Sequence, residues 1–174
     1  MIQGKRINIV PFDMKYLKDY FDGFNEEITK FQWPDPFKSI DTARDVLQEF
    51  LNEMEREETL FFSVLSKNGE FLGSVEVHGL TGDCPELGVW IIESEQKKGY
   101  AYEALTEVLT YVCLRYDKAD FYYEADIRNA GSTKLLHKFE NGYEIIAQGF
   151  EKLTTESGKR LELQGYILKA KKNI

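Results

Sequence analysis

Residues 86–112 constrain the fold more than any other part of the sequence. A hydrophobic run, ELGVWIIE (86–93), is followed by a short glycine-containing turn and then by the strongest helical pattern in the chain. A later run, 120–127, reads as another strand. The region therefore predicts a strand, a long helix and a second strand that cross over within one sheet. In the helix, apolar side chains recur three and four residues apart, at Ala101, Ala104, Leu105, Val108, Leu109 and Val112.

The rest of the chain supplies the other strands and helices of such a sheet. Alternating and β-branched runs predict strands over 5–10, 60–66, 71–80, 143–151 and 160–169. Helical spacing predicts shorter helices over 13–24, about 39–54 and 132–139. Because the sequence has no repeat or linker, we expect one domain over residues 1–174, with an α+β sheet covered by helices on both faces.

The charge and the cysteine content exclude several functions. The formal net charge of −8 repels nucleic-acid phosphates and anionic lipid, so we expect neither nucleic acid nor a membrane as partner. It would attract a cationic amine, although surplus acid is also a common solubility device. Cys84, Cys113, His78 and His137 do not form a ligand cluster, so no metal site is expected. No run is long enough to span a bilayer, and we expect a reducing cytoplasm.

The turn before the long helix has the features of an anion site. A helix N-terminus presents unpaired N–H groups and a partial positive charge. Gly99 can take a positive φ and leaves room for a phosphate, Ala101 is small, and Lys97 and Lys98 add local charge. The nucleotide motifs GxxxxGK followed by Ser or Thr, and GxGxxG, are both missing, which argues against a Walker ATPase and a Rossmann dehydrogenase.

Three segments together resemble a known family. QKKGYA (96–101) matches the pyrophosphate loop of the GNAT acyl-CoA N-acyltransferases, whose pattern is Gln or Arg, two residues, Gly, one residue, and Gly or Ala. ELGVWIIES before it resembles their fourth strand. Residues 129–143, with Asn129, Ser132, two leucines and Gly142-Tyr143, are similar to the NxxSxxLL and GF segment of the RimJ/RimL-type branch, the ribosomal-protein N-terminal acetyltransferases.

The resemblance implies both a fold and an activity. The fold would be a mixed, mostly antiparallel sheet of about seven strands, with a bulge in the fourth strand and a splay between the fourth and fifth. The activity would be transfer of an acetyl group from acetyl-CoA, the co-substrate, to a primary amine by direct attack in a ternary complex. The acceptor would be a protein N-terminus or a small cationic amine such as a polyamine. A non-catalytic acyl-CoA-binding module is the alternative, and a homodimer is also expected.

The resemblance also assigns the coenzyme-binding residues. The loop amides would hold the pyrophosphate, and backbone groups of the fourth strand would pair with the pantetheine arm, although those strand residues also fit as core filling. Asn129 and Ser132 would face the pantetheine, although either could instead be a helix N-cap. The loop and strand residues are Gln96, Lys97, Lys98, Gly99, Tyr100, Ala101, Trp90, Ile91 and Ile92.

The catalytic assignments stay open between a chemical and a plain surface role. Glu86 and Glu151 are the two candidate bases for the acceptor amine, and either could be surface charge. Ser132 could protonate the leaving thiolate. Many GNAT enzymes carry a tyrosine acid where this chain has Leu136. The segment FQWPDPF (31–37) could close the core or form a wall of the substrate pocket.

Overall fold

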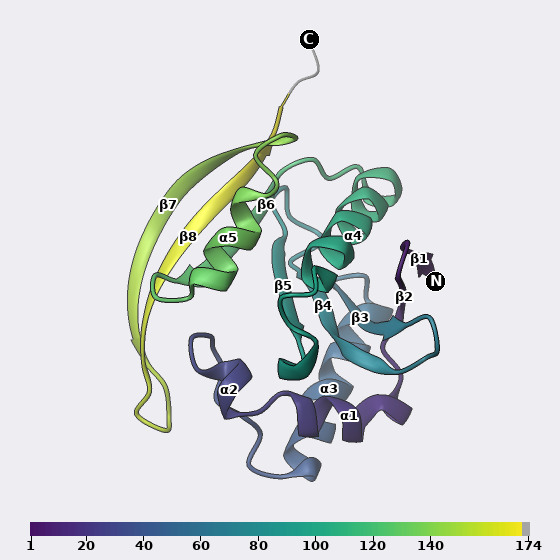
Figure 1. Cartoon of the computed structure of the whole chain (residues 1–174). Coiled ribbons are helices and arrows are strands. Elements are labelled where there is room, and N and C mark those ends of the chain that lie inside the picture. The colour runs from purple at the N-terminus through teal and green to yellow at the C-terminus, as the bar shows by residue number, and fades with distance from the viewer. Residues whose placement is uncertain (172–174) are drawn as a thin grey trace.

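The computed structural model describes residues 1–171, and its centre is one open, eight-stranded sheet with the order β1-β2-β3-β4-β5-β6-β8-β7 (Figure 1). All neighbouring strands are antiparallel except β5 and β6, which are parallel. The predicted α+β, mixed and mostly antiparallel sheet is therefore confirmed. It has one strand more than expected, β1, which is only two residues long and was not predicted. The strands are β1 Ile2–Gln3, β2 Ile7–Pro11, β3 Thr59–Ser66, β4 Phe71–His78, β5 Glu86–Ile91, β6 Phe121–Asp126, β7 Tyr143–Thr154 and β8 Arg160–Ala170.

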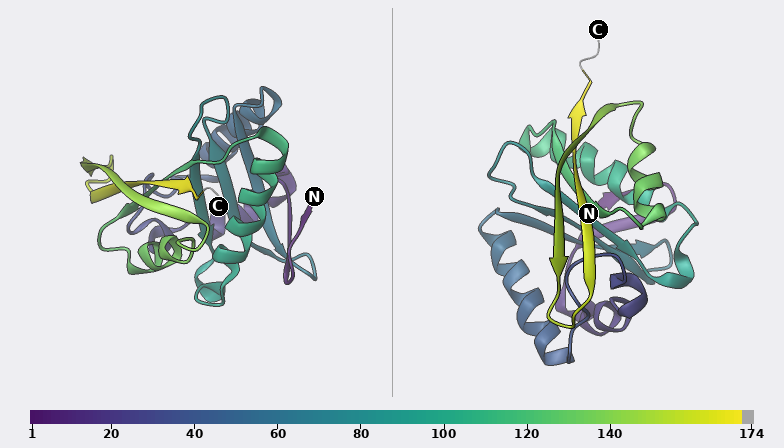
Figure 2. Two further views of the ribbon diagram at one scale, coloured as in Figure 1. Left: turned by 90° about the horizontal axis from the view of Figure 1, so that it is seen from above. Right: turned by 90° about the vertical axis from the view of Figure 1, so that its left-hand side faces the viewer.

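Helices cover both faces of the sheet, as predicted (Figure 2). One face carries α4 (Tyr100–Tyr116) and α5 (Ala130–His137). The other face carries α1 (Leu17–Gly23), α2 (Glu26–Thr29) and α3 (Ile40–Glu55). Short 3-10 turns precede α1 at Met14–Tyr16 and follow β5 at Glu93–Glu95. Within residues 1–171, no helix is both long enough and apolar enough to cross a bilayer.

Successive side chains of the inner strands pack into two separate hydrophobic cores, one on each face of the sheet. On β3, Phe61 packs among the α1 and α3 side chains, whereas its neighbour Phe62 packs on the α4 side. The alternation follows from the pleat, which points successive side chains to opposite faces. It explains why β3 reads as a continuous hydrophobic run, since both of its faces are buried.

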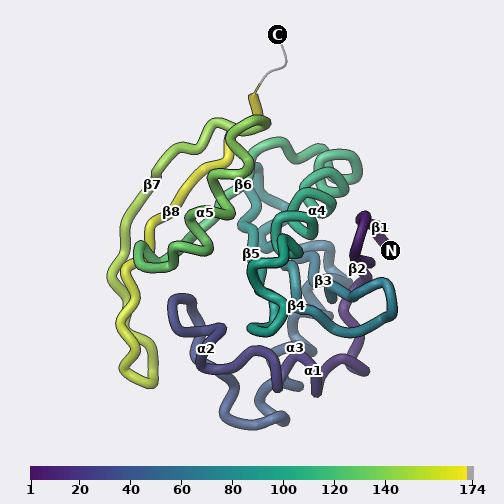
Figure 3. The backbone as a smooth tube through the Cα atoms, viewed as in Figure 1, coloured from purple at the N-terminus to yellow at the C-terminus, as the bar shows by residue number. Residues whose placement is uncertain are grey.

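The parallel pair β5 and β6 opens into a gap (Figure 3). The two strands are paired only at Glu86 with Tyr122 and at Leu87 with Tyr123, while β6 stays paired with β8 along its whole length. Beyond Leu87, the β6-facing side of β5 has no strand partner among the described residues. This is the predicted splay, because β5 corresponds to the fourth strand of the resemblance.

The expected bulge in β5 is wrong for the part of the chain that the structure describes. The pairing of β4 with β5 runs in unbroken register from Gly73–Ile91 to His78–Glu86. Register shifts occur instead in the pairing of β3 with β4, at Val64 and Leu65, and in the pairing of β7 with β8, at Ala147 and Phe150. The opening beside β5 therefore arises from the course of β6 and not from an extra residue in β5.

Candidate active site

A cavity of about 370 Å³ lies in the gap between β5 and β6. It extends from the turn before α4 to the first turn of α5, and the α2 region closes one side of it. The side chains that matter below are Ile28, Gln32, Val89, Trp90, Ile91, Gln96, Lys97, Gly99, Tyr100, Ala101, Tyr123, Asn129, Ser132, Lys134 and Lys138. A cleft of this size between splayed strands suits an extended ligand.

The turn before α4 has the backbone of an anion site. Gly99 has φ 88° and Lys97 has φ 61°, so two left-handed residues curve the chain around its amide groups. Gly99 is the N-cap and supplies no side-chain acceptor, so the first N–H groups of α4 remain open towards the cavity. Gln96 donates from Nε2 to the carbonyl oxygen of Ile91 at 3.1 Å, which ties the turn to the end of β5.

Arg6, a residue that was not predicted from the sequence to belong to the site, stabilises the turn before α4. Its Nη1 donates to the carbonyl oxygen of Lys98 at 2.8 Å, and its Nε pairs with Glu103 Oε2 at 2.8 Å. The guanidinium also lies over the ring of Tyr100, 4.9 Å from its centroid. The pKa of Glu103 is lowered because hydrogen bonds and the charge of Arg6 outweigh the effect of burial. Arg6, the residue before β2, thus connects that strand to the N-terminal end of α4.

The free side of β5 presents the backbone groups of alternate residues. The carbonyl oxygen of Pro85 accepts from Tyr122 N at 2.9 Å and therefore points towards β6. Because the direction alternates along a strand, Leu87, Val89 and Ile91 point the same way, and Val89 and Ile91 lie in the open gap. These two residues can pair with an extended ligand.

Hydroxyl groups from β6 and α5 meet inside the cavity. Tyr123 Oη and Ser132 Oγ are 2.6 Å apart, and either can be the donor. Tyr123 is buried, and burial raises the pKa of its phenol, which opposes ionisation near neutral pH. Asn129 Oδ1 accepts from Ser132 N at 3.0 Å and caps α5.

Carboxylates gather on the opposite face of the sheet, outside the cavity lining. Glu86 lies at the start of β5. The pKa of its carboxyl group is raised mainly by loss of hydration on burial and, to a smaller extent, by repulsion from Glu124, whereas nearby His78 lowers it. Tyr122 donates to Glu124 Oε2 at 3.0 Å. Burial and then the carboxylates, among them Glu86 and Glu151, raise the pKa of Tyr122 to about 12, so its phenol remains a neutral donor.

A protein-family model matches most of the chain and identifies its family. The model described as an acetyltransferase (GNAT) domain matches residues 6–140, well over half of the chain. The chain belongs to the GNAT acetyltransferase family. A search among curated proteins finds no match.

Solved structures with the same fold as this GNAT chain include RimL-type enzymes, as the sequence resemblance predicted. RimL, a ribosomal L7/L12 alpha-N-protein acetyltransferase in complex with coenzyme A, is 16% identical with TM-score 0.79, covering 95% of both chains. An acetyl transferase from Salmonella typhimurium that modifies the N-terminal serine of L7/L12 is 15% identical with TM-score 0.79, covering 96% of both. A spermidine N-acetyltransferase from Vibrio cholerae, with CoA and spermine, is 16% identical with TM-score 0.77, covering 94% of this chain and 96% of that one.

The GNAT domain brings most of the predicted coenzyme residues to the cavity, with two exceptions. Lys98 does not line it, because its ammonium group pairs with Glu95 at 2.8 Å. Ile92 does not line it either, because its N–H donates to Leu72 and its carbonyl oxygen accepts from Glu95.

The backbone of Trp90 is also turned away from the gap. Trp90 is paired with Ser74 of β4, and a Cβ atom on Gly73 would collide with the Trp90 carbonyl oxygen. Its indole lines the cavity, but the backbone of Val89, and not the backbones of Trp90 and Ile92, has the orientation that the predicted pairing requires. The prediction was one residue out of phase because the phase is set by pairing with β4, which the local sequence does not reveal.

Several cavity residues of the GNAT domain were missed from the sequence. Tyr123 was expected only as part of the strand at 120–127, and Lys134 and Lys138 only as part of the helix at 132–139. The lysines carry a recognisable signal, since they are four residues apart and so share one face of α5 and its end. Ile28 and Gln32 had no such signal. Within residues 1–171, no group of three or more His, Cys, Asp or Glu side chains is arranged to hold a metal ion.

The capping role of Asn129 can be separated from a ligand role. Asn129→Ala should lower the free energy of unfolding by about 1 kcal/mol, because the Ser132 N–H loses its acceptor. Asn129→Ser should restore most of that stability, since a serine hydroxyl can also cap. Urea unfolding of both variants tests this. Equal stability of the alanine and serine variants would contradict the capping role, and an acetyl-CoA Kd raised in both would indicate a direct ligand contact.

Proposed function

We propose that this GNAT domain is an acetyl-CoA-dependent N-acetyltransferase that modifies a primary amine. The observation that carries the proposal is the continuity of one cavity. It joins an anion-binding turn at Gly99 to the free backbone edge of β5 at Val89 and Ile91. A ligand that has a pyrophosphate at one end and an extended amide arm at the other matches both parts.

Each end of the cavity contributes differently to binding. The open amides of the first turn of α4 would hold the pyrophosphate, and Lys97, Lys134 and Lys138 would add positive charge around it. Val89 and Ile91 would pair with the pantetheine amides. The bound thioester supplies an activated acetyl group, and a backbone N–H on this edge can polarise its carbonyl oxygen.

The amine would be deprotonated from the face that carries the carboxylates. Glu86, whose raised pKa makes it a better base than an ordinary carboxylate, would remove the proton, directly or through a water molecule. Glu151 is the second candidate, because it is close enough to influence Tyr122. As the amine forms the C–N bond and the C–S bond breaks, Ser132 would give its proton to the departing thiolate and recover one from water as the products leave, while the neutral Tyr123 hydroxyl, 2.6 Å away, holds the Ser132 oxygen in place.

The acceptor is proposed to be cationic. The solved structures with this fold include enzymes for a ribosomal protein N-terminus and for spermidine, and both acceptors carry amines. The acidic groups on the acceptor face favour a protonated amine over a neutral one. A homodimer, a cytoplasmic location and the lack of nucleic-acid partners stay predictions from the sequence.

A non-catalytic acyl-CoA-binding module is the second candidate. It is favoured by one observation, that neither Glu86 nor Glu151 lines the cavity in which the thioester would lie. A module of this kind would bind acetyl-CoA through the same turn and strand edge but would release no product.

Mass spectrometry of reaction products distinguishes the two candidates. The purified protein would be incubated with acetyl-CoA and a panel of basic N-terminal peptides, polyamines and other small amines. We expect one acetyl group added to an amine of at least one panel member. Acetyl-CoA binding without any product would favour the non-catalytic module, and no binding of acetyl-CoA would overturn the whole proposal.

A further inference from the structure

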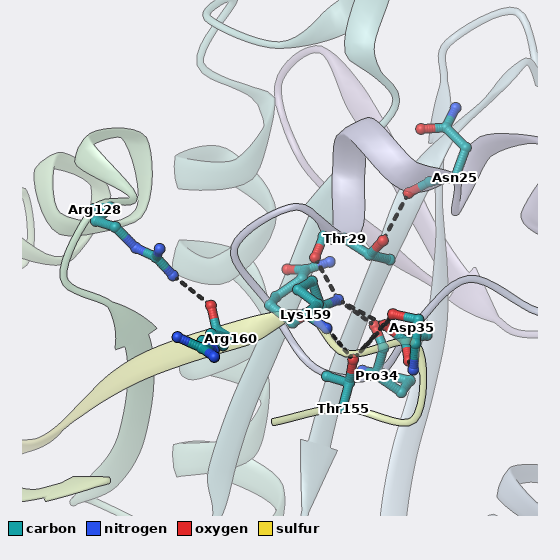
Figure 4. A network of polar contacts seen from close by, with 10 residues as sticks. Asn25, Thr29, Pro34, Asp35, Arg128, Thr155, Lys159 and Arg160 are labelled. Atoms are coloured by element: carbon teal, nitrogen blue, oxygen red, sulfur yellow. Dashed lines mark hydrogen bonds and ion pairs between the residues drawn. The ribbon is translucent and has the colours of Figure 1, made fainter. Parts of the chain in front are cut away.

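The ammonium group of Lys159 holds together a part of the chain that has little regular structure (Figure 4). Its Nζ donates to the carbonyl oxygens of Thr29 and Gln32, both at 2.8 Å, and lies 3.3 Å from that of Pro34. An ammonium group has only three protons, so these contacts use its donor capacity. The side chain of Lys159 is 18% exposed, and removing it would leave three carbonyl groups without this partner.

Asp35 fastens the same segment to the turn between β7 and β8. Its Oδ1 accepts from the hydroxyls of Thr155 and Ser157 at 2.8 Å, and its Oδ2 accepts from Ser157 N at 2.9 Å. It also pairs with Lys159 at 3.3 Å. Burial alone would raise the pKa of Asp35, but these bonds hold it well below its ordinary value. The carboxylate therefore stays ionised across the physiological pH range.

The segment fixed in this way is a wall of the cavity. Ile28 and Gln32 line the cavity, and Thr29 and Gln32 are the residues whose carbonyls bind Lys159. The wall stands on the α1–α3 side of the sheet, the side of the carboxylates, and Ile28 packs in the same cluster as Trp90. It is thus placed where an acceptor amine would approach.

The opposite wall is tied to the same hairpin turn. Arg128 Nη2 donates to the carbonyl oxygen of Arg160 at 2.7 Å, and its guanidinium lies over the Phe31 ring. Arg128 also binds the buried Asp126 through two nitrogen atoms, at 2.7 and 2.8 Å. The next residue, Asn129, lines the cavity. Residues 155–160 therefore connect both walls.

We propose that Lys159 and Asp35 are positioning residues for the acceptor: they hold the Ile28–Gln32 wall at the acceptor side of the cavity and thereby set the acceptor KM. Neither residue lines the cavity in which acetyl-CoA is proposed to bind. The inference rests on the proposed acetyltransferase function and adds to it the residues that govern acceptor binding. A displacement of about 1 Å in such a wall can change a rate by two orders of magnitude.

The test separates acceptor binding from coenzyme binding. Lys159→Met and the milder Asp35→Asn should each raise the acceptor KM by about tenfold or more. The acetyl-CoA Kd, measured by calorimetry on the same samples, should change less than about twofold. Because the two residues act through one contact network, the double variant should raise the KM much less than the product of the two single effects.

A matched control uses a second ion pair between the same two segments. Lys38 and Glu156 lie 3.3 Å apart, but their side chains are 82% and 87% exposed. An exposed pair of this kind contributes little, so Lys38→Met should leave the acceptor KM unchanged. Circular dichroism melting of all variants establishes whether they are folded. If Lys159→Met does not fold, Asp35→Asn still tests the inference.

Each other result would overturn the inference. An unchanged acceptor KM in a folded Lys159→Met or Asp35→Asn variant removes the positioning role. An equal rise in acceptor KM and acetyl-CoA Kd indicates a general structural role instead. If the wild-type protein forms no product, the proposed function and the acceptor role fail together. Hydrogen exchange then decides the remaining claim, since Lys159→Met should speed exchange in residues 28–34 but not in residues 97–103.

Discussion

Replacing Gly99 by glutamate is expected to raise the Kd for acetyl-CoA by at least about tenfold. Two effects act in the same direction. A residue with a Cβ atom at φ 88° carries strain of about 1–2 kcal/mol, and a Cβ atom here would also lie 3.2 Å from Arg6 Nη2. In addition, the new carboxylate would add a negative charge next to the anion site and repel the phosphates. Calorimetric titration with acetyl-CoA measures the change.

Two companion variants distinguish strain from charge. Gly99→Ala has the backbone strain without the carboxylate, so its effect should be smaller than that of glutamate. Gly69→Glu is the matched control, because Gly69 has φ 87° in a turn with open space around it. It should lose stability but keep the wild-type Kd. Wild-type affinity in Gly99→Glu would remove this turn from the proposed coenzyme site.

Replacing Glu86 by glutamine is expected to lower kcat/KM for the acceptor by about 100-fold at neutral pH, the usual minimum for loss of a general base. The glutamine has nearly the same shape but cannot accept a proton. The acetyl-CoA Kd should not change, because Glu86 lies outside the cavity lining. In the wild-type protein, the acid limb of the plot of kcat against pH should have its midpoint above the ordinary carboxyl pKa of about 4.3. In Glu86→Gln this limb should be lost.

The same substitution should not destabilise the protein. When the folded-state pKa of an acid is raised, its ionisation opposes folding, so stability falls as the pH rises from the unfolded-state pKa through the folded-state pKa. Glu86→Gln removes that penalty and should raise the free energy of unfolding at neutral pH. Lower activity with equal or higher stability would therefore separate catalysis from folding. Full activity in Glu86→Gln, together with inactive Glu151→Gln, would transfer the role of base to Glu151.

Local sequence patterns were sufficient for most of the elements of this fold. The helix α4 follows from apolar residues at helical spacing after Gly99, and the prediction of 101–112 lies inside the observed Tyr100–Tyr116. The strands β3, β4 and β5 follow from hydrophobic runs separated by turn residues. The short elements α2 and β1 were missed, because four and two residues are too few to carry a periodicity.

In the candidate site, too, the parts that could be predicted are those that depend on consecutive residues. The turn at 96–101 could be predicted because its chemistry is contained in consecutive residues, with a positive φ at Gly99 and open amides at a helix start. The capping of α5 by Asn129 was also a local expectation, and the structure has it.

The sequence by itself therefore determined most of the elements, their order and the glycine-containing turn before α4, because each depends on neighbouring residues and their backbone preferences. The tertiary structure decided which backbone groups of β5 face the gap, because that phase depends on pairing with β4. It also decided the approach of Tyr123 to Ser132 and the joining of Asp35 to Lys159, a contact between residues more than a hundred positions apart. Such contacts arise only when the whole chain has folded, and no local pattern encodes them.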